Sequence, residues 1–229
     1  MLSYFADFLA LFYPKYCDGC GKTLTRGEQC LCSFCLSSLP KTNFHTDQNN
    51  PLEMVFAGRV PIFKAAAFCF FKKGNITQHV VHQLKYKGKR EIGIYLGHLF
   101  GLDLSENKDF LSVDIILPIP LHPKKLKKRG YNQSEQIAKG IAKSMSKPVD
   151  TKSLIRIVET ATQTNKTRYA RWENASEIFQ LAAPEKLIGK HILLVDDIVT
   201  TGATVESAAQ QLTHLDGIKI SIACLGYAT

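Results

Sequence analysis

Short runs of apolar residues alternate with helical repeats of apolar residues along most of the 229-residue chain. Residues 192–195 are all apolar, which is typical of a strand buried on both faces, as in parallel sheets. Similar runs predict strands at 60–71, 113–120, 153–158 and 218–225. Apolar residues at helical spacing predict helices that contain 76–84, 92–99, 137–145 and 205–212. We therefore predict an α/β fold with a parallel sheet flanked by helices.

Two of these strands are each followed by a polar loop and a helix. Residues 113–120 are expected to form the first buried strand of the main sheet, and the strand at 192–195 is expected in the same sheet. Ligands of open parallel sheets collect beyond the carboxyl ends of the strands. If these two strands are neighbours, the loops that follow them face each other.

The loop after residues 192–195 combines acidic and small hydroxyl side chains. Asp196 and Asp197 come first, and the turn that opens the next helix contains glycine. Such a turn offers backbone N–H groups to a phosphate, and threonine hydroxyls add donors. Carboxylates repel a phosphate and suit sugar hydroxyls or a Mg²⁺ that a phosphate also binds. The alternative is an ordinary turn with acidic caps, but the complete pattern favours a sugar-phosphate site. Its loop residues are Thr200, Thr201, Gly202, Ala203 and Thr204.

Two basic segments are candidates for contact with the charged end of such a ligand. The helix at 76–84 is followed by a cluster that includes Lys85 and Lys87, which is either a solvated helix end or an anion contact. The loop at 121–134 carries five cations and follows the strand at 113–120. Some of these lysines are expected to be solvated. The residues of this loop that best suit a site are Arg129, Gly130 and Asn132.

A polar segment at 160–179 separates two predicted strands. So long a segment is uncommon between strands unless it works as a lid or a binding loop. Its cations include Lys166 and Arg171, which either close over a bound anion or keep the loop soluble.

The composition is that of a globular protein with a basic surface. Hydrophobic residues make up 45% of the chain and charged residues 21%, which suits one good core and a small appendage. The net charge of +9 suits polyanionic partners, namely pyrophosphate compounds, nucleic acid or an acidic membrane surface. The charge does not choose among them.

Two pairs of cysteines near the N-terminus are spaced as metal ligands. Cys17 with Cys20, and Cys32 with Cys35, form two C-x₂-C pairs that bring four thiolates to a tetrahedral structural Zn²⁺. Nothing marks the chain as secreted, which disfavours disulfides, and a redox dithiol needs no second pair. Cys30 is an alternative to Cys32 as a ligand. We predict a structural zinc ribbon.

The remaining N-terminal segments suggest how the chain is divided. Residues 2–13 are apolar, with their large side chains on one helical face. The segment is too short to span a bilayer and has no signal-peptide cleavage site. We therefore expect a helix that packs on the rest of the protein, with peripheral membrane contact as the less favoured alternative. The chain is predicted to be cytoplasmic, with no transmembrane segment. Residues 42–59 look like a linker in which His45 is solvated. We expect an N-terminal unit at 1–45 and a main domain at 60–229.

The stretch HILLVDDIVTTGAT resembles the 5-phosphoribosyl-1-pyrophosphate (PRPP) motif of type I phosphoribosyltransferases. The resemblance implies a type I phosphoribosyltransferase-like fold and PRPP as ligand, accompanied by Mg²⁺. It also implies that Asp196 and Asp197 meet the ribose 2′ and 3′ hydroxyls and that the loop at 200–204 wraps the 5′-phosphate.

Nearly the whole chain is similar to the ComF family of phosphoribosyltransferase-like bacterial proteins, which are associated with DNA uptake in natural competence. The similarity rests on the four cysteines, LKYKGK, PIPLHPKKLKKRGYNQSEQIA, TQTNKTRYARWENASEIF and the PRPP motif, in this order. It implies that 129–133 belongs to the pyrophosphate-side loop and that Lys166 and Arg171 belong to a mobile loop. Other competence proteins are implied as partners.

The sequence leaves the reaction open. In an active transferase, pyrophosphate would be displaced at the ribose C1, with cations and metal stabilising its charge. No residue that recognises an acceptor is identifiable, and no catalytic residue is assigned. The alternatives are a PRPP sensor or a single-stranded DNA-binding protein, for which the basic loops with interleaved aromatic residues are suited.

Overall fold

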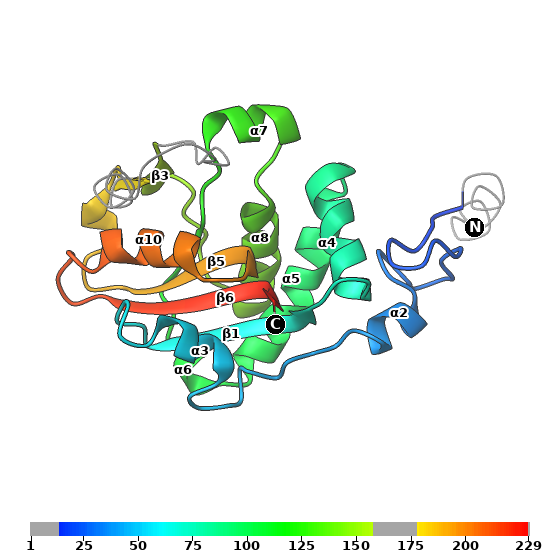
Figure 1. The fold of residues 1–229 in the computed structure, drawn as a ribbon, viewed down its shortest axis with the longest axis horizontal. Coiled ribbons are helices and arrows are strands. Elements are labelled where there is room, and N and C mark those ends of the chain that lie inside the picture. The colour runs from blue at the N-terminus through cyan, green and yellow to red at the C-terminus, as the bar shows by residue number, and fades with distance from the viewer. Residues whose placement is uncertain (1–13, 158–177, 229) are drawn as a thin grey trace.

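The computed structural model describes residues 14–157 and 178–228 (Figure 1). Its main sheet has four parallel strands in the spatial order β1 (Lys64–Phe71), β6 (Lys219–Ala228), β5 (His191–Val199) and β2 (Ile115–Pro118). The α/β fold and the parallel sheet predicted from the apolar runs are therefore confirmed. The strand predicted at 113–120 is not the first of this sheet, because β1 precedes it and forms the opposite edge.

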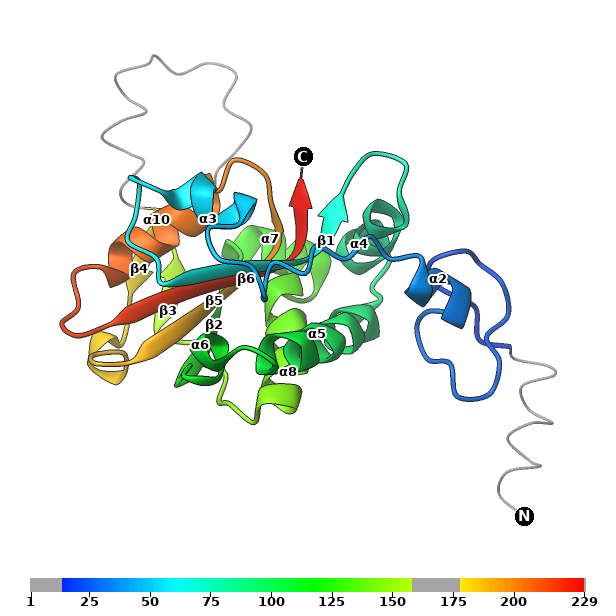
Figure 2. The same ribbon diagram turned by 90° about the horizontal axis from the view of Figure 1, so that it is seen from below.

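Helices cover both faces of the sheet. Figure 2 shows α5 (Arg90–Ser105) and α8 (Gln133–Met145) on one face, and α3 (Pro51–Phe56) and α10 (Ala203–Leu212) on the other. The apolar residues of each helix point inward, which is why the helical repeats in the sequence predict α5, α8 and α10. The short helix α3 is not among the predicted elements. The other helices in the described residues are α2 (Ser33–Ser37), α4 (Ile76–Tyr86), α6 (Lys108–Leu111), α7 (Pro123–Arg129) and a 3₁₀ turn at Pro184–Lys186.

The predicted strand at 153–158 does not join the main sheet. It forms β3 (Leu154–Arg156), which pairs antiparallel with β4 (Phe179–Leu181) in a separate two-stranded sheet. The predicted binding loop with Lys166 and Arg171, and the predicted helix at 2–13, lie outside the described residues. Within the described ranges, no helix is both long enough and apolar enough to cross a membrane.

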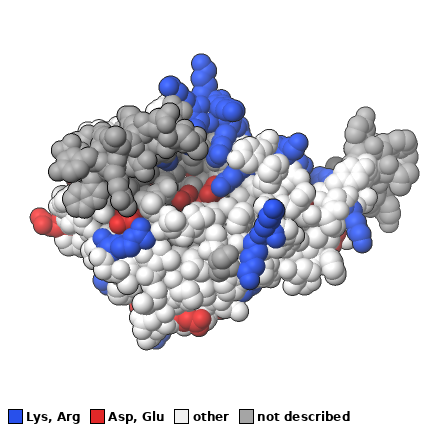
Figure 3. Space-filling model, viewed as in Figure 1, with Lys and Arg blue, Asp and Glu red and all other residues white. Residues whose placement is uncertain are grey.

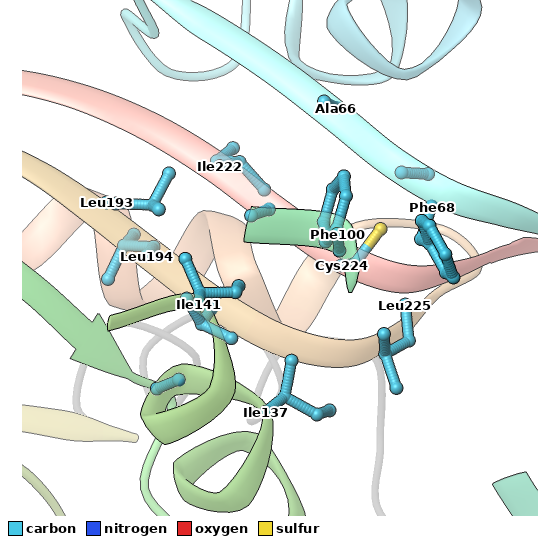
Figure 4. Packing of buried hydrophobic residues seen from close by; sticks show 14 of the residues in the cluster. Ala66, Phe68, Phe100, Ile137, Ile141, Leu193, Leu194, Ile222, Cys224 and Leu225 are labelled. Atoms are coloured by element: carbon cyan, nitrogen blue, oxygen red, sulfur yellow. The ribbon is translucent and has the colours of Figure 1, made fainter. Parts of the chain in front are cut away.

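The core lies between the sheet and its helices (Figure 4). Leu193 and Leu194 on β5 are fully buried, and Ile137 and Ile141 of α8 pack against this part of the sheet. Cys224, on β6, is also fully buried, as expected for a cysteine in apolar surroundings. Burial on both faces explains the uninterrupted apolar run at 192–195.

Two glycines allow α5 and α8 to cross at close range. A Cβ atom at Gly97 would lie 2.2 Å from the Ile137 carbonyl oxygen, and one at Gly140 would lie 2.2 Å from the Ile94 carbonyl oxygen. The two helix backbones are therefore in direct contact. This contact fixes the position of α8, whose first turn reaches the carboxyl end of β5.

The segment at 42–59 is not the polar linker that its composition suggests. It contains α3, whose Leu52 and Phe56 are fully buried, and Asn50 both caps this helix and donates to the Ala65 carbonyl oxygen on β1 at 2.9 Å. His45, expected to be solvated, is only 6% exposed. A few apolar residues anchor this segment to the sheet, although polar residues surround them in the sequence.

Candidate functional site

The loops that follow β2 and β5 lie next to each other. The two strands pair in parallel, with Pro118 opposite Val195 near their carboxyl ends. The two strands are thus neighbours, which is the condition for the loops after them to face each other. The chain beyond β5 supplies the acidic residues and the threonine loop, and the chain beyond β2 supplies α7 and the first turn of α8.

The two carboxylates lie within β5, which is longer than the predicted strand. The Asp196 Oδ1 atom accepts hydrogen bonds from the Ser134 hydroxyl at 3.0 Å and from the Asp197 backbone N–H at 2.8 Å. Burial and the adjacent Asp197 carboxylate raise the pKa of Asp196 to about 7. Burial disfavours the ionised form, and the Asp197 carboxylate repels a second negative charge. Ser134, at the start of α8, was not singled out from the sequence.

Lys85 supplies a cation to this acidic pair. Its Nζ atom lies 3.0 Å from the Asp197 Oδ2 atom, and the two side chains are only 21% and 14% exposed. Lys85 lies in the last turn of α4, which places it beside the end of β5 although the two elements are far apart in the sequence. The basic cluster after residues 76–84 therefore contributes at least one side chain to the site and is not only a solvated helix end.

The threonine loop encloses a small hollow of about 40 Å³, which is lined by 198–205 and by Asp196. Gly202 has a φ of 77° and stands at the N-terminus of α10. This end of a helix carries unpaired N–H groups and the positive end of the helix dipole. The five predicted loop residues are thus brought together around one hollow, beside the carboxylates.

A larger basic pocket of about 390 Å³ lies between the end of α4 and α7. Arg129 stacks over the Tyr86 ring at 5.5 Å and donates to the Gln133 Oε1 atom at 2.8 Å. Figure 3 shows lysine and arginine side chains gathered over α7, above a hollow in which acidic side chains are visible. The lining residues are Lys85, Tyr86, Gly88, Lys125, Lys128 and Arg129.

Three further residues that were predicted to contact the anion do not line the basic pocket. Asn132 caps α8 and donates to the Ile119 carbonyl oxygen at 2.9 Å, so its buried side chain holds the loop together. Gly130 ends α7 with a φ of 77°. Lys87 is exposed at the end of α4 and does not line the basic pocket.

Arg59 is a residue near the site that the sequence did not reveal. It follows α3, and its guanidinium group contacts the Thr201 carbonyl oxygen and the Glu206 carboxylate. It lies in the segment that reads as a linker, so no pattern in the sequence distinguishes it from other surface arginines.

The four predicted cysteine ligands also come together. The sulfur atoms of Cys17, Cys20, Cys32 and Cys35 lie within 4.8 Å of one another, and the Cys20 and Cys32 sulfurs are 3.7 Å apart. A tetrahedral zinc site with Zn–S bonds of about 2.3 Å requires sulfurs roughly 3.8 Å apart. The cluster could therefore hold a metal such as zinc. Among the described residues, Cys30 does not belong to this group.

Backbone groups favour the thiolate form of one cysteine of this cluster. The Cys17 sulfur accepts from the backbone N–H groups of Gly19 at 3.3 Å and Cys32 at 3.2 Å. Burial alone would raise the pKa of Cys17, but these N–H groups outweigh burial and the pKa falls to about 7. One contact of the unit with the rest of the chain is the ion pair of Asp18 with Lys89 at 3.3 Å.

Comparison with known proteins agrees with this geometry. Residues 131–228 match the phosphoribosyl transferase domain family. The chain is 28% identical to the DNA utilization protein YhgH of Shigella flexneri over 220 residues, which cover 95% of this chain and 92% of that protein. It is 32% identical to the Salmonella typhimurium protein of the same name, over 64% of this chain and 65% of that protein.

A further relative carries a different name. The chain is 28% identical to the competence protein ComFC of Bacillus subtilis over 141 residues, which cover 60% of this chain and 54% of that protein. The domain match, the relatives, the parallel sheet and the four-cysteine cluster agree with one another. Together these findings support a ComF-type, phosphoribosyltransferase-like protein.

Proposed function

We propose that the chain binds PRPP at the carboxyl ends of β2 and β5. The observation that supports this proposal is the spatial order of three parts of the site: the hollow of the threonine loop, the two aspartates and the basic pocket. Asp196 lines the hollow of the threonine loop, and Asp197 contacts Lys85, which lines the basic pocket. PRPP has the same order, because its ribose hydroxyls lie between a 5′-phosphate and a pyrophosphate.

Each part of the site has a chemical role in this proposal. Asp196 and Asp197 hydrogen-bond the ribose hydroxyls, which can donate to a carboxylate and accept from a protonated carboxyl. Backbone N–H groups and threonine hydroxyls at 200–204 hold the 5′-phosphate. Lys85 and Arg129 face the pyrophosphate, as do the lysines of α7 that line the same pocket.

Magnesium fits this arrangement as a companion of the ligand. Carboxylate oxygens are preferred ligands of Mg²⁺, which also binds substrate phosphates. When bound, the ion would reduce the charge on the pyrophosphate. In the four-cysteine cluster we propose zinc with a structural role, since four thiolates leave no open coordination position.

If the site turns over, the bond between the ribose C1 and the pyrophosphate oxygen breaks as an acceptor forms a bond to C1. Lys85 and Arg129 would stabilise the charge that grows on the departing pyrophosphate. The two aspartates would orient the ribose. The acceptor is not assigned.

The relatives' names support a role in DNA uptake. They are called DNA utilization proteins and competence proteins. We propose that this chain acts in DNA uptake during natural competence, in the cytoplasm and beside other competence proteins. A second candidate is direct binding of single-stranded DNA. It is favoured by Tyr86, which is 63% exposed beside the cations of the basic pocket and could stack on a base.

Calorimetric titration of PRPP with Mg²⁺ tests the binding site. We expect wild-type binding, and loss of binding when Asp196 and Asp197 are both replaced by Ala. The matched control, Asp47→Ala with Asp216→Ala, removes the same two charges at exposed positions and should bind as wild type does. Circular dichroism checks that the variants are folded. Equal affinity of the site variant and the wild type would disprove the assignment.

Pyrophosphate release in the presence of bases and amines then distinguishes the functional classes. Release would make the protein a transferase and name its acceptor. Binding without release would favour a sensor or a DNA-handling protein. For the DNA candidate, affinity for a single strand should fall steeply with salt, because phosphate contacts release counterions. A salt-independent affinity would exclude it.

A further inference from the structure

Arg59 joins three elements behind the threonine loop. Its Nη1 atom donates to the Val55 carbonyl oxygen in α3 at 2.9 Å and to the Thr201 carbonyl oxygen in the loop at 2.8 Å. Its Nη2 atom pairs with the Glu206 carboxylate in the first turn of α10. Arg59 does not line the hollow that the loop encloses, so it acts from outside.

The contact with the Thr201 carbonyl sets the direction of one N–H group. Described peptide bonds in the chain are all trans, and in a trans peptide the carbonyl of one residue points away from the N–H of the next. Because Arg59 holds the Thr201 carbonyl oxygen on the α3 side, the Gly202 N–H is turned to the opposite side. Both residues line the hollow, which is where a phosphate would be bound.

This peptide needs a partner to hold it. A peptide that precedes a glycine turns over readily, because glycine accepts both signs of φ. Here Gly202 has a φ of 77°, and a Cβ atom at this position would lie 2.8 Å from Val55 Cγ1 and 2.9 Å from Phe56 Cε1. The loop therefore rests directly on α3, and the adjacent Arg59 holds the Thr201–Gly202 peptide from the same side.

We propose that Arg59 is a positioning residue that locks the Thr201–Gly202 peptide with its N–H directed at the ligand's 5′-phosphate. The inference rests on the PRPP site proposed above. Arg59 is paired with Glu206, so its charge is largely neutralised and a long-range attraction for the ligand is a minor part of its effect. Its effect is local to the phosphate end of the site.

The test compares ligands that occupy different parts of the site. In Arg59→Met we expect the affinity for PRPP and for ribose 5-phosphate to fall roughly tenfold or more, because the hydrogen bond from the Gly202 N–H to the charged 5′-phosphate is lost. Affinity for pyrophosphate alone should stay within about twofold of wild type. Arg59→Lys keeps the charge but not the two-carbonyl geometry, so it should not restore ribose 5-phosphate binding.

A spectroscopic measurement separates positioning from general damage. The Gly202 amide signal in ¹H–¹⁵N NMR should shift when ribose 5-phosphate is added to wild type and should not shift in Arg59→Met. Lys41→Met is the matched control, because it breaks an ion pair of 2.8 Å with Asp103 away from the loop. It should bind ribose 5-phosphate normally.

The outcomes distinguish this inference from the proposed function. If wild type binds neither PRPP nor ribose 5-phosphate, the proposed function fails and the inference falls with it. If wild type binds and Arg59→Met binds equally well, only the inference fails. Full rescue by Arg59→Lys would show that charge alone matters, and an equal loss of pyrophosphate binding would show a general loss of structure; either result overturns the inference.

Discussion

Asp196 is held in surroundings that oppose its ionisation. Its carboxyl group is buried beside the carboxylate of Asp197, and the Ser134 hydroxyl and one backbone N–H offset only part of this cost. Perturbed carboxyl groups are concentrated at functional sites. The acidic pair is costly to the ligand-free fold, as expected for the ribose contact proposed above.

This cost predicts a pH dependence of stability. The pKa of Asp196 is about 7 in the folded state, above its ordinary value of 3.8, so the folded state binds more protons and the free energy of unfolding falls as pH rises through this range. Asp196→Asn removes this contribution. Relative to wild type, the variant should gain about 2 kcal/mol more at pH 8 than at pH 5.

Urea unfolding at the two pH values checks this prediction. Asp216→Asn, at an exposed position, serves as the control for loss of one carboxylate. If Asp196→Asn shifts the free energy of unfolding equally at both pH values, the buried carboxyl is not the source of the pH dependence.

At the scale of single residues, the sequence indicates which candidate residues lie together where they are neighbours in the chain. Asp196, Asp197 and the residues at 200–204 form one continuous motif. The structure gathers Asp196 and 200–204 around one hollow and places Asp197 beside it, against Lys85. Ser134 and Arg59 reach the same place from distant segments. Their contacts depend on tertiary packing, and nothing in their local sequence encodes it.

At the scale of elements, the crossing of α5 and α8 positions the site. The helices touch through Gly97 and Gly140, and α8 begins at the turn from which Ser134 reaches Asp196. A side chain at either glycine would push α8 away from α5. The carboxyl ends of the strands would then lose one of their supports.

Gly97→Ala tests this crossing. The new Cβ atom would overlap the Ile137 carbonyl oxygen, so we expect a loss of about 1–3 kcal/mol in the free energy of unfolding and weaker PRPP binding. Leu102→Ala, on the same helix at a position that is 48% exposed, should change stability much less. Chemical denaturation of the two variants makes the comparison. Equal stability would argue against backbone contact between the helices.

The four-cysteine unit makes its own prediction. Purified protein should contain one zinc per chain, and Cys17→Ser should lose it, because three thiolates do not close the site. Cys30→Ser is the matched control and should keep the metal, since Cys30 lies outside the cluster. Elemental analysis measures the content. Absence of metal from wild type, or its loss from Cys30→Ser, would contradict the assignment.

Sequence patterns predicted most elements but not the role of α3. A six-residue helix flanked by polar residues gives too short a repeat to be recognised, so the segment at 42–59 looked like a linker. Its few apolar residues are nevertheless buried, and it supports the threonine loop through Val55 and Phe56. Short elements are defined by what they pack against, which the local sequence does not state.

At the scale of the whole molecule, the sheet extends beyond the matched domain. The domain match covers 131–228, whereas β1 and β2 both precede it. Without them, one edge of β6 and one edge of β5 would lose their partners. The sequence indicated a parallel sheet, but strand order depends on pairings between distant segments and was only partly predictable.

A fragment of residues 131–228 should therefore fail to fold by itself. The unpaired strand edges and the exposed apolar face of the sheet would favour aggregation. Size-exclusion chromatography and circular dichroism of this fragment, beside the complete chain, provide the measurement. A monomeric fragment with cooperative unfolding would show that the matched domain is independent of the preceding strands.

The position of β6 between β1 and β5 also has a consequence for biosynthesis. β1 ends at Phe71, and β6, its partner, begins only at Lys219. At roughly 5–20 residues per second, the ribosome delivers this partner about 7–30 s after β1. β5 itself ends only at Val199, so for most of that interval β1 alone waits for β6, and the sheet closes late in translation. The nascent chain is thus a natural client for chaperones that cover exposed strand edges.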